Sequence, residues 1–132
     1  MKNRAEDPLV EIRNLKKYFK IKNKGMLHAV DDVSLEIYPG ETLGLVGESG
    51  CGKSTIGNLI MRLLEPTEGQ VLYRGKDIFS MKGEEKQALC KNMQIIFQDP
   101  YSALNPRKTI FSILEEPYIV QHIGRNTGER RK

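Results

Sequence analysis

A glycine-rich stretch constrains this chain more than any other feature. It fits the pattern G-x-x-x-x-G-K-[ST] and reads Gly47-Glu48-Ser49-Gly50-Cys51-Gly52-Lys53-Ser54-Thr55. The apolar run before it, at 42–46, predicts a buried strand, and residues 56–64 follow with apolar side chains at helical spacing. A strand, a glycine loop and a helix in this order are the setting in which the pattern marks a phosphate site.

The residue types in this stretch suit a bound phosphate chain for separate physical reasons. Gly47, Gly50 and Gly52 allow tight turns that point successive N–H groups into one concavity. The helix that follows adds partial positive charge at its N-terminus. Lys53 is expected to reach the outer phosphates, and the hydroxyl of Ser54 is expected to bind Mg²⁺. The plain structural alternative is a glycine-rich turn that merely joins a strand to a helix.

Composition is typical of a soluble globular protein of one domain. The 132 residues are 29% charged and 39% hydrophobic, and the net charge of +4 accompanies basic clusters near both ends. We interpret these clusters as solvated faces rather than as a surface for nucleic acid or an acidic membrane, because no RNA-binding signature accompanies them. No run approaches the roughly 18 apolar residues of a membrane span. The N-terminus does not resemble a secretory signal, so we expect a cytoplasmic protein whose two cysteines are free thiols.

Periodicity along the rest of the chain predicts alternating strands and helices. Residues 1–8 are expected to form a flexible leader, and residues 9–132 the folded part. Strands are predicted at 9–15 with a continuation to 21, at 28–38, at 70–74 and at 92–97, with turns at 22–25 and 75–77. Helices are predicted at 83–91 and 108–116, with Thr109 as an N-cap and Pro117 as a kink or an interruption. The two strands ahead of the glycine loop favour an antiparallel piece beside the phosphate site.

Four segments together resemble a known family. They are VDDVSLEIYPGETLGLV at 30–46, the loop filler ESGC at 48–51, IFQDP at 96–100 and YSALNPR at 101–107. In combination they resemble the ATP-binding subunit of ABC transporters, and most closely its oligopeptide and dipeptide importer branch; IFQDP is similar to the family's Q-loop. The resemblance covers nearly all of the chain. It implies an α/β fold: part of a P-loop NTPase core of the ABC type, with an N-terminal antiparallel β piece and the start of the helical subdomain.

The resemblance also implies roles for two side chains outside the glycine loop. Tyr18 matches the aromatic residue that stacks on adenine in this family, with Phe19 as the fallback; the alternative is that Tyr18 belongs to the core or its rim. Gln98 matches the Q-loop glutamine, which approaches Mg²⁺ and the attacking water; the alternative is a strand-end glutamine that faces solvent. The implied cofactors are ATP and Mg²⁺.

Members of this family hydrolyse ATP as a head-to-tail pair of ATP-binding subunits docked on transmembrane permease subunits. The 132 residues contain no Ser-Gly-Gly signature and no apolar run that ends in Asp-Glu. We therefore expect the N-terminal part of such a subunit, which binds ATP weakly and hydrolyses little alone. The implied function is ATP binding that powers import of peptides or related small solutes, at the inner face of the cell membrane and without nucleic acid. The alternative is a truncated nucleotide-binding fragment without ATPase activity.

Other interpretations of the same residues are weaker. A P-loop kinase or GTPase is one alternative, but the Asn-Lys-x-Asp motif of GTPases is absent; a soluble ABC protein is another, and residues 101–107 favour transport over it. The run at 95–99 ends in Asp99, as a segment that supports Mg²⁺ would, yet Gln98 interrupts it. His28 and His122 are isolated, and no metal-ligand spacing joins them, so neither is a metal or catalytic candidate.

Overall fold

The computed structural model describes residues 7–99, 104–121 and 123. It divides into two units, Met1–Gln94 and Ile95–Lys132, which are described separately. Residues 1–6 of the predicted leader, Pro100 at the end of IFQDP, residues 101–103 of the importer-like segment, His122 and the C-terminal basic cluster lie outside the described residues.

The first unit is built on an antiparallel sheet, as the sequence predicts. The described strands are β1 (Val10–Ile21), β2 (Gly25–Ile37), β3 (Glu68–Tyr73) and β4 (Lys76–Asp77), in the order β2-β1-β3-β4. β1 and β2 form a hairpin whose turn is closed by the N–H of Lys24 donating to the carbonyl of Ile21, 3.1 Å away. The predicted turn at 75–77 is wrong in detail, because Lys76 and Asp77 pair with the end of β3 and so form β4.

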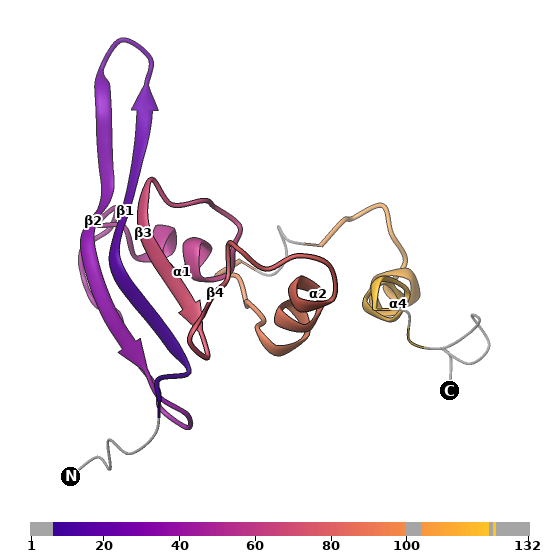
Figure 1. Ribbon diagram of the computed structural model, residues 1–132. Coiled ribbons are helices and arrows are strands. Elements are labelled where there is room, and N and C mark those ends of the chain that lie inside the picture. The colour runs from indigo at the N-terminus through magenta and orange to yellow at the C-terminus, as the bar shows by residue number, and fades with distance from the viewer. Residues whose placement is uncertain (1–6, 100–103, 122, 124–132) are drawn as a thin grey trace. The chain divides into compact units, whose positions relative to one another are not determined.

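The hairpin is longer than the rest of the sheet. β3 pairs with β1 only between Val10 and Lys16. Beyond that point the two strands continue as a ribbon, residues 17–29, which we call the hairpin arm; Figure 1 shows it extending past the end of β3. The ribbon bends where it leaves the sheet: Asn14 and Asp32 have positive φ (46° and 53°), and the Asn14 amide donates to the Asp32 carboxylate at 2.9 Å. A two-stranded ribbon without a third strand is marginally stable by itself.

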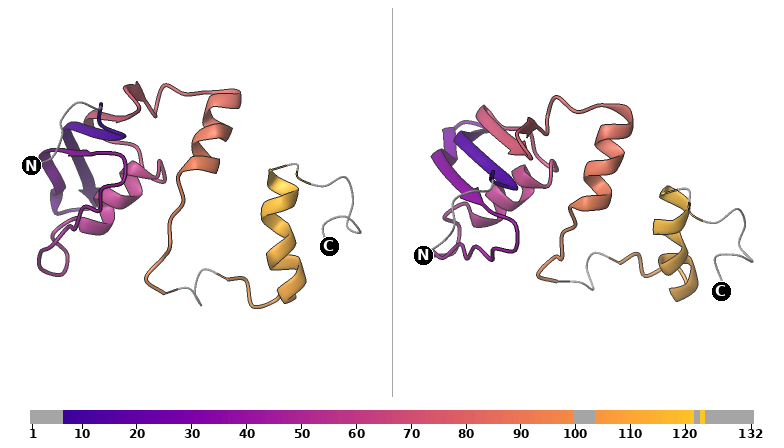
Figure 2. Two further views of the ribbon diagram at one scale, coloured as in Figure 1. Left: turned by 90° about the horizontal axis from the view of Figure 1, so that it is seen from below. Right: turned by 60° about the horizontal axis from the view of Figure 1, so that its bottom comes forward.

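One helix covers the inner face of this sheet and continues directly from the glycine-rich stretch. α1 (Lys53–Ile60) begins at the loop lysine and ends earlier than the predicted helix at 56–64. Figure 2 shows α1 against one face of the strands. Its Ile56 and Leu59 are buried with alternate residues of the strands, which confirms the predicted apolar stripe. The buried core comprises Val10, Ile12, Leu15, Val30, Ile56, Leu59, Val71, Ile78, Met81 and Leu89.

The predicted helix at 83–91 is confirmed as α2 (Gly83–Asn92), which ends the first unit. Leu89 is its buried residue. Glu84 and Glu85 lie in the first turn and Lys91 in the last, which complements the helix dipole at both ends. The ammonium of Lys76 forms an ion pair with the carboxylate of Glu85 and so connects β4 to α2.

Two predicted buried strands are absent from the structure. Residues 42–46 have no regular secondary structure, and Val46 is 98% exposed. Residues 93–97 are likewise irregular, and Ile96 is 94% exposed. Apolar composition favours burial, but a strand also needs a neighbour to satisfy its backbone N–H and C=O groups. The sheet order of the described strands includes neither segment, so neither run has a strand partner there.

The described part of the second unit contains the predicted C-terminal helix, α4 (Ile110–Val120). Thr109 is its N-cap, as predicted: the Thr109 hydroxyl accepts from the N–H of Ser112 at 3.2 Å. Pro117 does not end the helix, which continues for three more residues. The Lys108 ammonium lies 2.8 Å from the Glu116 carboxylate and forms an ion pair along the helix.

Candidate nucleotide site

The glycine loop leads into α1 through two residues with left-handed backbone. Gly50 has φ 82°, and Gly52, the N-cap of α1, has φ 94°. Gly52 is also buried: a Cβ placed on it would lie 2.2 Å from the carbonyl oxygen of Ala29 in β2. Both the φ value and this close approach require glycine. The glycine loop therefore packs directly against the backbone of the hairpin.

Lys53 is folded back over the loop that precedes it. Its Nζ donates to the carbonyl oxygens of Gly47 at 2.7 Å and Glu48 at 2.5 Å, and lies 3.5 Å from Sγ of Cys51. These contacts set a cation above the loop, with carbonyl dipoles and a thiol rather than carboxylates around it. An anion bound there would meet a positive charge that forms no ion pair with a carboxylate of the described residues.

The remaining residues of the stretch are accessible to a ligand. Glu48, Ser49, Cys51 and Ser54 are exposed, and Thr55 is half-buried. The first turn of α1 reads Lys53-Ser54-Thr55-Ile56, so the positive end of the helix dipole meets hydroxyls and a cation. The loop, its lysine and the start of the helix thus combine the N–H groups, the charge and the hydroxyl that a phosphate chain requires.

Tyr18 lies on the hairpin arm in a direct cross-strand pair with His28. The two rings are stacked, with centroids 3.9 Å apart and planes 18° from parallel. The Tyr18 hydroxyl donates to Oδ1 of Asp31 at 2.5 Å, and Oδ2 of the same carboxylate lies 3.5 Å from Nδ1 of His28. The hydrogen bond from Tyr18 lowers the pKa of Asp31, and the same bond raises the pKa of Tyr18. The Asp31 carboxylate thus contacts the polar atoms of both side chains.

The hairpin arm carries both candidate aromatic residues, Tyr18 and Phe19. Ala29, whose carbonyl oxygen packs against Gly52, follows His28 in the chain. Phe19, the alternative to Tyr18, is the next residue along β1, and successive strand residues point to opposite faces. Its ring is paired instead with Lys17, whose Nζ lies 5.1 Å from the ring centroid. Tyr18 is thus stacked on His28, while Phe19 has a different neighbour; the choice between them as the adenine platform stays a prediction.

Gln98 belongs to the second unit, where it is an exposed residue at a bend, and Asp99 follows it. Its predicted role stays a prediction. His28 was missed by the sequence analysis, which set it aside as an isolated histidine. The signal that identifies it is strand pairing: it is opposite Tyr18 because β1 and β2 shift register next to this pair, between Lys17 and Tyr18.

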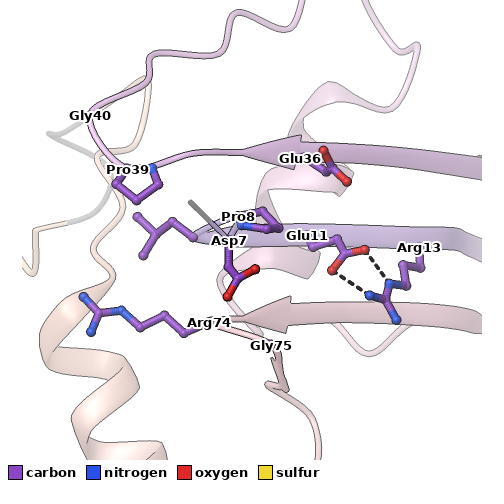
Figure 3. Close-up of a pocket in the computed structure, with 10 residues that line it drawn as sticks. Asp7, Pro8, Glu11, Arg13, Glu36, Pro39, Gly40, Arg74 and Gly75 are labelled. Carbon is purple, nitrogen blue, oxygen red and sulfur yellow. Dashed lines mark hydrogen bonds and ion pairs between the residues drawn. The ribbon is translucent and has the colours of Figure 1, made fainter. Parts of the chain in front are cut away.

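A separate hollow lies on the outer face of the sheet, shown in Figure 3. It measures about 780 Å³, and residues 7–9, 39–40 and 74–75 contribute to its lining with Glu11, Arg13 and Glu36. One ion pair lies within its wall, because Arg13 donates to Glu11 at 2.5 and 2.8 Å. Glu36 accepts from the Tyr38 hydroxyl at 2.6 Å. None of the residues predicted to bind nucleotide lines this hollow, so it is distinct from the phosphate loop.

Cys51 provides a chemical probe of the loop. Its thiol is exposed and lies between Gly47 and the Lys53 ammonium. We expect a maleimide to modify Cys51 and bound Mg·ATP to protect it, since the phosphates would fill the adjoining space. Peptide mass spectrometry after brief labelling measures this, with Cys90, which is exposed on α2, as the internal control. Equal labelling of Cys51 with and without Mg·ATP would show that it does not line the occupied site.

None of the helices in the described residues is long and apolar enough to span a membrane. Within the same residues, no cluster of three or more His, Cys, Asp or Glu side chains could hold a metal ion.

Comparisons with known proteins identify the family of the chain. The family model described as ABC transporter matches residues 30–130. The oligopeptide transport ATP-binding protein AppF of Bacillus subtilis is 48% identical over 120 residues, covering 86% of this chain and 36% of AppF. The dipeptide transport ATP-binding protein DppF of Haemophilus influenzae is 47% identical over 119 residues, with the same shares of 86% and 36%. The chain thus spans about a third of the length of these curated relatives.

Solved structures give the same result for the fold. A dimeric structure of MJ0796, a bacterial ABC transporter cassette, has a TM-score of 0.74 and 30% identity, over 92% of this chain and 52% of the cassette. A dimeric post-hydrolysis state of MJ0796 bound to ADP and Pi has a TM-score of 0.73 and 31% identity, with the same coverage. The predicted fold class, part of an ABC-type P-loop core with an N-terminal antiparallel sheet, is confirmed. The glycine loop seated on an antiparallel hairpin is thus part of a nucleotide-binding cassette, and the chain belongs to the ABC transporter family.

Proposed function

We propose that this chain binds Mg·ATP through residues 47–55, with the adenine placed against Tyr18. The observation that supports this most directly is the position of the Lys53 ammonium, over a glycine loop whose Gly52 is packed against the hairpin backbone beside the Tyr18–His28 pair. Phosphates can replace the loop carbonyls as partners of Lys53, and a flat π surface suits a nucleobase. MJ0796, a cassette similar to this chain, has been solved with ADP and Pi.

Mg²⁺ would be held by the hydroxyl of Ser54, with phosphate oxygens as further ligands. Ser54 fits this role because it is exposed in the first turn of α1, one residue after Lys53. Gln98, in the second unit, is proposed as the amide oxygen that approaches the metal and orients water. When bound, the metal neutralises charge on the phosphates; Lys53 and the loop N–H groups orient the chain of phosphates.

For the whole protein we propose an ATPase that powers import of peptides or related small solutes. Support comes from relatives named as oligopeptide and dipeptide transport ATP-binding proteins. The partners would be transmembrane permease subunits and a second ATP-binding subunit, in line with the dimeric cassettes. Such an assembly would place the protein in the cytoplasm, on the inner face of the membrane.

A narrower function is proposed for the 132-residue chain taken alone. Its sequence holds neither Ser-Gly-Gly nor Asp-Glu, the motifs that the resemblance associates with the γ-phosphate cap and the general base. Phosphoryl transfer to water requires a group that aims the water in line. We therefore propose nucleotide binding with turnover below about 1 per second, the lower end of typical enzyme rates. A steady-state rate above that value would contradict this part of the proposal.

The test is a calorimetric titration of the chain with Mg·ATP, repeated in the presence of tripolyphosphate. Since both ligands would occupy the glycine loop, tripolyphosphate should compete with Mg·ATP, and ATP should bind more tightly because of its base. Binding of Mg·ATP that is indifferent to saturating tripolyphosphate would contradict a phosphate site at residues 47–55.

A further inference from the structure

The rings of Tyr18 and His28 are packed together before any nucleotide is bound. Their centroids are 3.9 Å apart and their planes are 18° from parallel, which is face-to-face stacking of neighbouring strand residues. A planar ring has two faces, and His28 covers one face of Tyr18. If a base stacks on Tyr18, it must use the opposite face.

Asp31 fixes the orientation of both rings. Its Oδ1 accepts from the Tyr18 hydroxyl at 2.5 Å, and its Oδ2 lies 3.5 Å from Nδ1 of His28. The side chains of His28 and Asp31 remain 54% and 56% exposed, so neither is a core residue held by burial. The stack and the hydrogen bond to the shared carboxylate therefore both restrict the rotamers of Tyr18 on the hairpin arm. A ring that is already ordered loses less conformational entropy when a ligand binds to it.

His28 of the stacked pair is the chain neighbour of Ala29, the residue against which the glycine loop packs. Gly52 of the loop packs against the carbonyl of Ala29, the residue after His28. Beyond Lys16 the arm has no third strand from β3. At this level it is supported by the N–H of Tyr18, which donates to Oγ1 of Thr67 at 3.0 Å, by Nζ of Lys17, which donates to the carbonyl of Glu65 at 2.7 Å, and by cross-strand contacts such as the stacked pair.

Resting on the nucleotide-binding function proposed above, we propose that His28 is a positioning residue for the nucleobase. It backs Tyr18 on one face and leaves the other face for adenine, with Asp31 holding the two rings together. His28 itself does not contact the phosphates. Its contribution should therefore appear with ligands that carry a base and vanish with ligands that are phosphate alone.

The experiment compares dissociation constants for Mg·ATP and for magnesium tripolyphosphate across five forms of the chain: wild type, His28→Ala, His28→Phe, Tyr18→Ala and the double alanine variant. Loss of the stack in His28→Ala should weaken ATP binding about fivefold, the size of effect typical of aromatic pairs, and leave tripolyphosphate binding unchanged. His28→Phe restores a flat ring behind Tyr18 and should recover ATP affinity. In the Tyr18→Ala background, removing His28 should have no further effect.

The matched control is Met26→Ala, a change on the same strand two residues away, at a side chain that is 54% exposed. It should leave both constants unchanged, and thermal unfolding should show that every form is folded. Wild-type ATP affinity in His28→Ala, or parallel loss of ATP and tripolyphosphate, would overturn the inference about His28. A wild-type chain that binds neither ligand would instead overturn the proposed function, so the two failures are distinguishable.

Discussion

Replacing Lys53 by alanine should weaken Mg·ATP binding by about 100-fold, or about 2.7 kcal/mol. The Lys53 ammonium lies over the loop and is surrounded there by the Gly47 and Glu48 carbonyls and the Cys51 thiol. Phosphate oxygens would replace these neutral partners with charged ones, and hydrogen bonds between ionised groups are the strongest that side chains form. Calorimetry of the variant with Mg·ATP measures the loss.

Lys20→Ala is the matched control, because it removes the same charge from an exposed site. Lys20 lies on the hairpin arm and forms no ion pair within the described residues. It should leave the affinity within about twofold of wild type, since exposed charges at a distance are largely screened. Wild-type affinity in Lys53→Ala would rule out the glycine loop as the phosphate site.

The variant Gly52→Ala should destabilise the folded chain by about 2–4 kcal/mol and abolish nucleotide binding with it. A methyl group at this position would meet the carbonyl oxygen of Ala29 at 2.2 Å, and alanine is strained at a φ of 94°. Backbone, rather than the end of a flexible side chain, is the obstacle. The loop or β2 must therefore move, and either movement separates the loop from the aromatic pair.

Gly57→Ala tests whether the effect is specific to position 52. Gly57 lies inside α1, and a Cβ added there meets nothing within 4 Å. Alanine favours helix more than glycine does, so this variant should gain about 0.5–1 kcal/mol. Urea unfolding of both variants measures the difference. If the Gly52→Ala chain has the same free energy of unfolding as wild type, the backbone near Ala29 can move to accept the methyl group without loss of stability, which would contradict the prediction.

The sequence pattern alone was enough to predict the elements whose signals lie close together in the chain. Signals that lie within a few residues predicted these elements. Alternation predicted the hairpin, and helical spacing predicted α1, α2 and α4, the last with its Thr109 cap. The glycine loop was readable because its conformation depends on the glycines that it contains. Membership of the ABC family followed from the same segments and is confirmed.

What the sequence did not reveal depends on pairing between distant residues. The runs at 42–46 and 93–97 have strand composition, but the described strands provide neither run with a hydrogen-bonding neighbour. A register shift between β1 and β2 places His28 opposite Tyr18, and the periodicity of the sequence does not predict such a shift. The approach of Gly52 to Ala29 likewise joins segments more than 20 residues apart. The roles of Tyr18, Ser54 and Gln98 stay predictions until nucleotide binding is measured.

The length of the hairpin arm has a practical consequence for engineering. β3 stops supporting β1 at Lys16, while the turn at 22–24 lies beyond the Tyr18–His28 pair and pairs with nothing except the arm itself among the described strands. Extra residues at this tip cost mainly the entropy of closing a longer loop, which grows slowly with length. A short reporter peptide or a fluorophore attached between Asn23 and Lys24 would therefore lie at the tip of the arm that carries the Tyr18–His28 pair, outside the contacts of that pair.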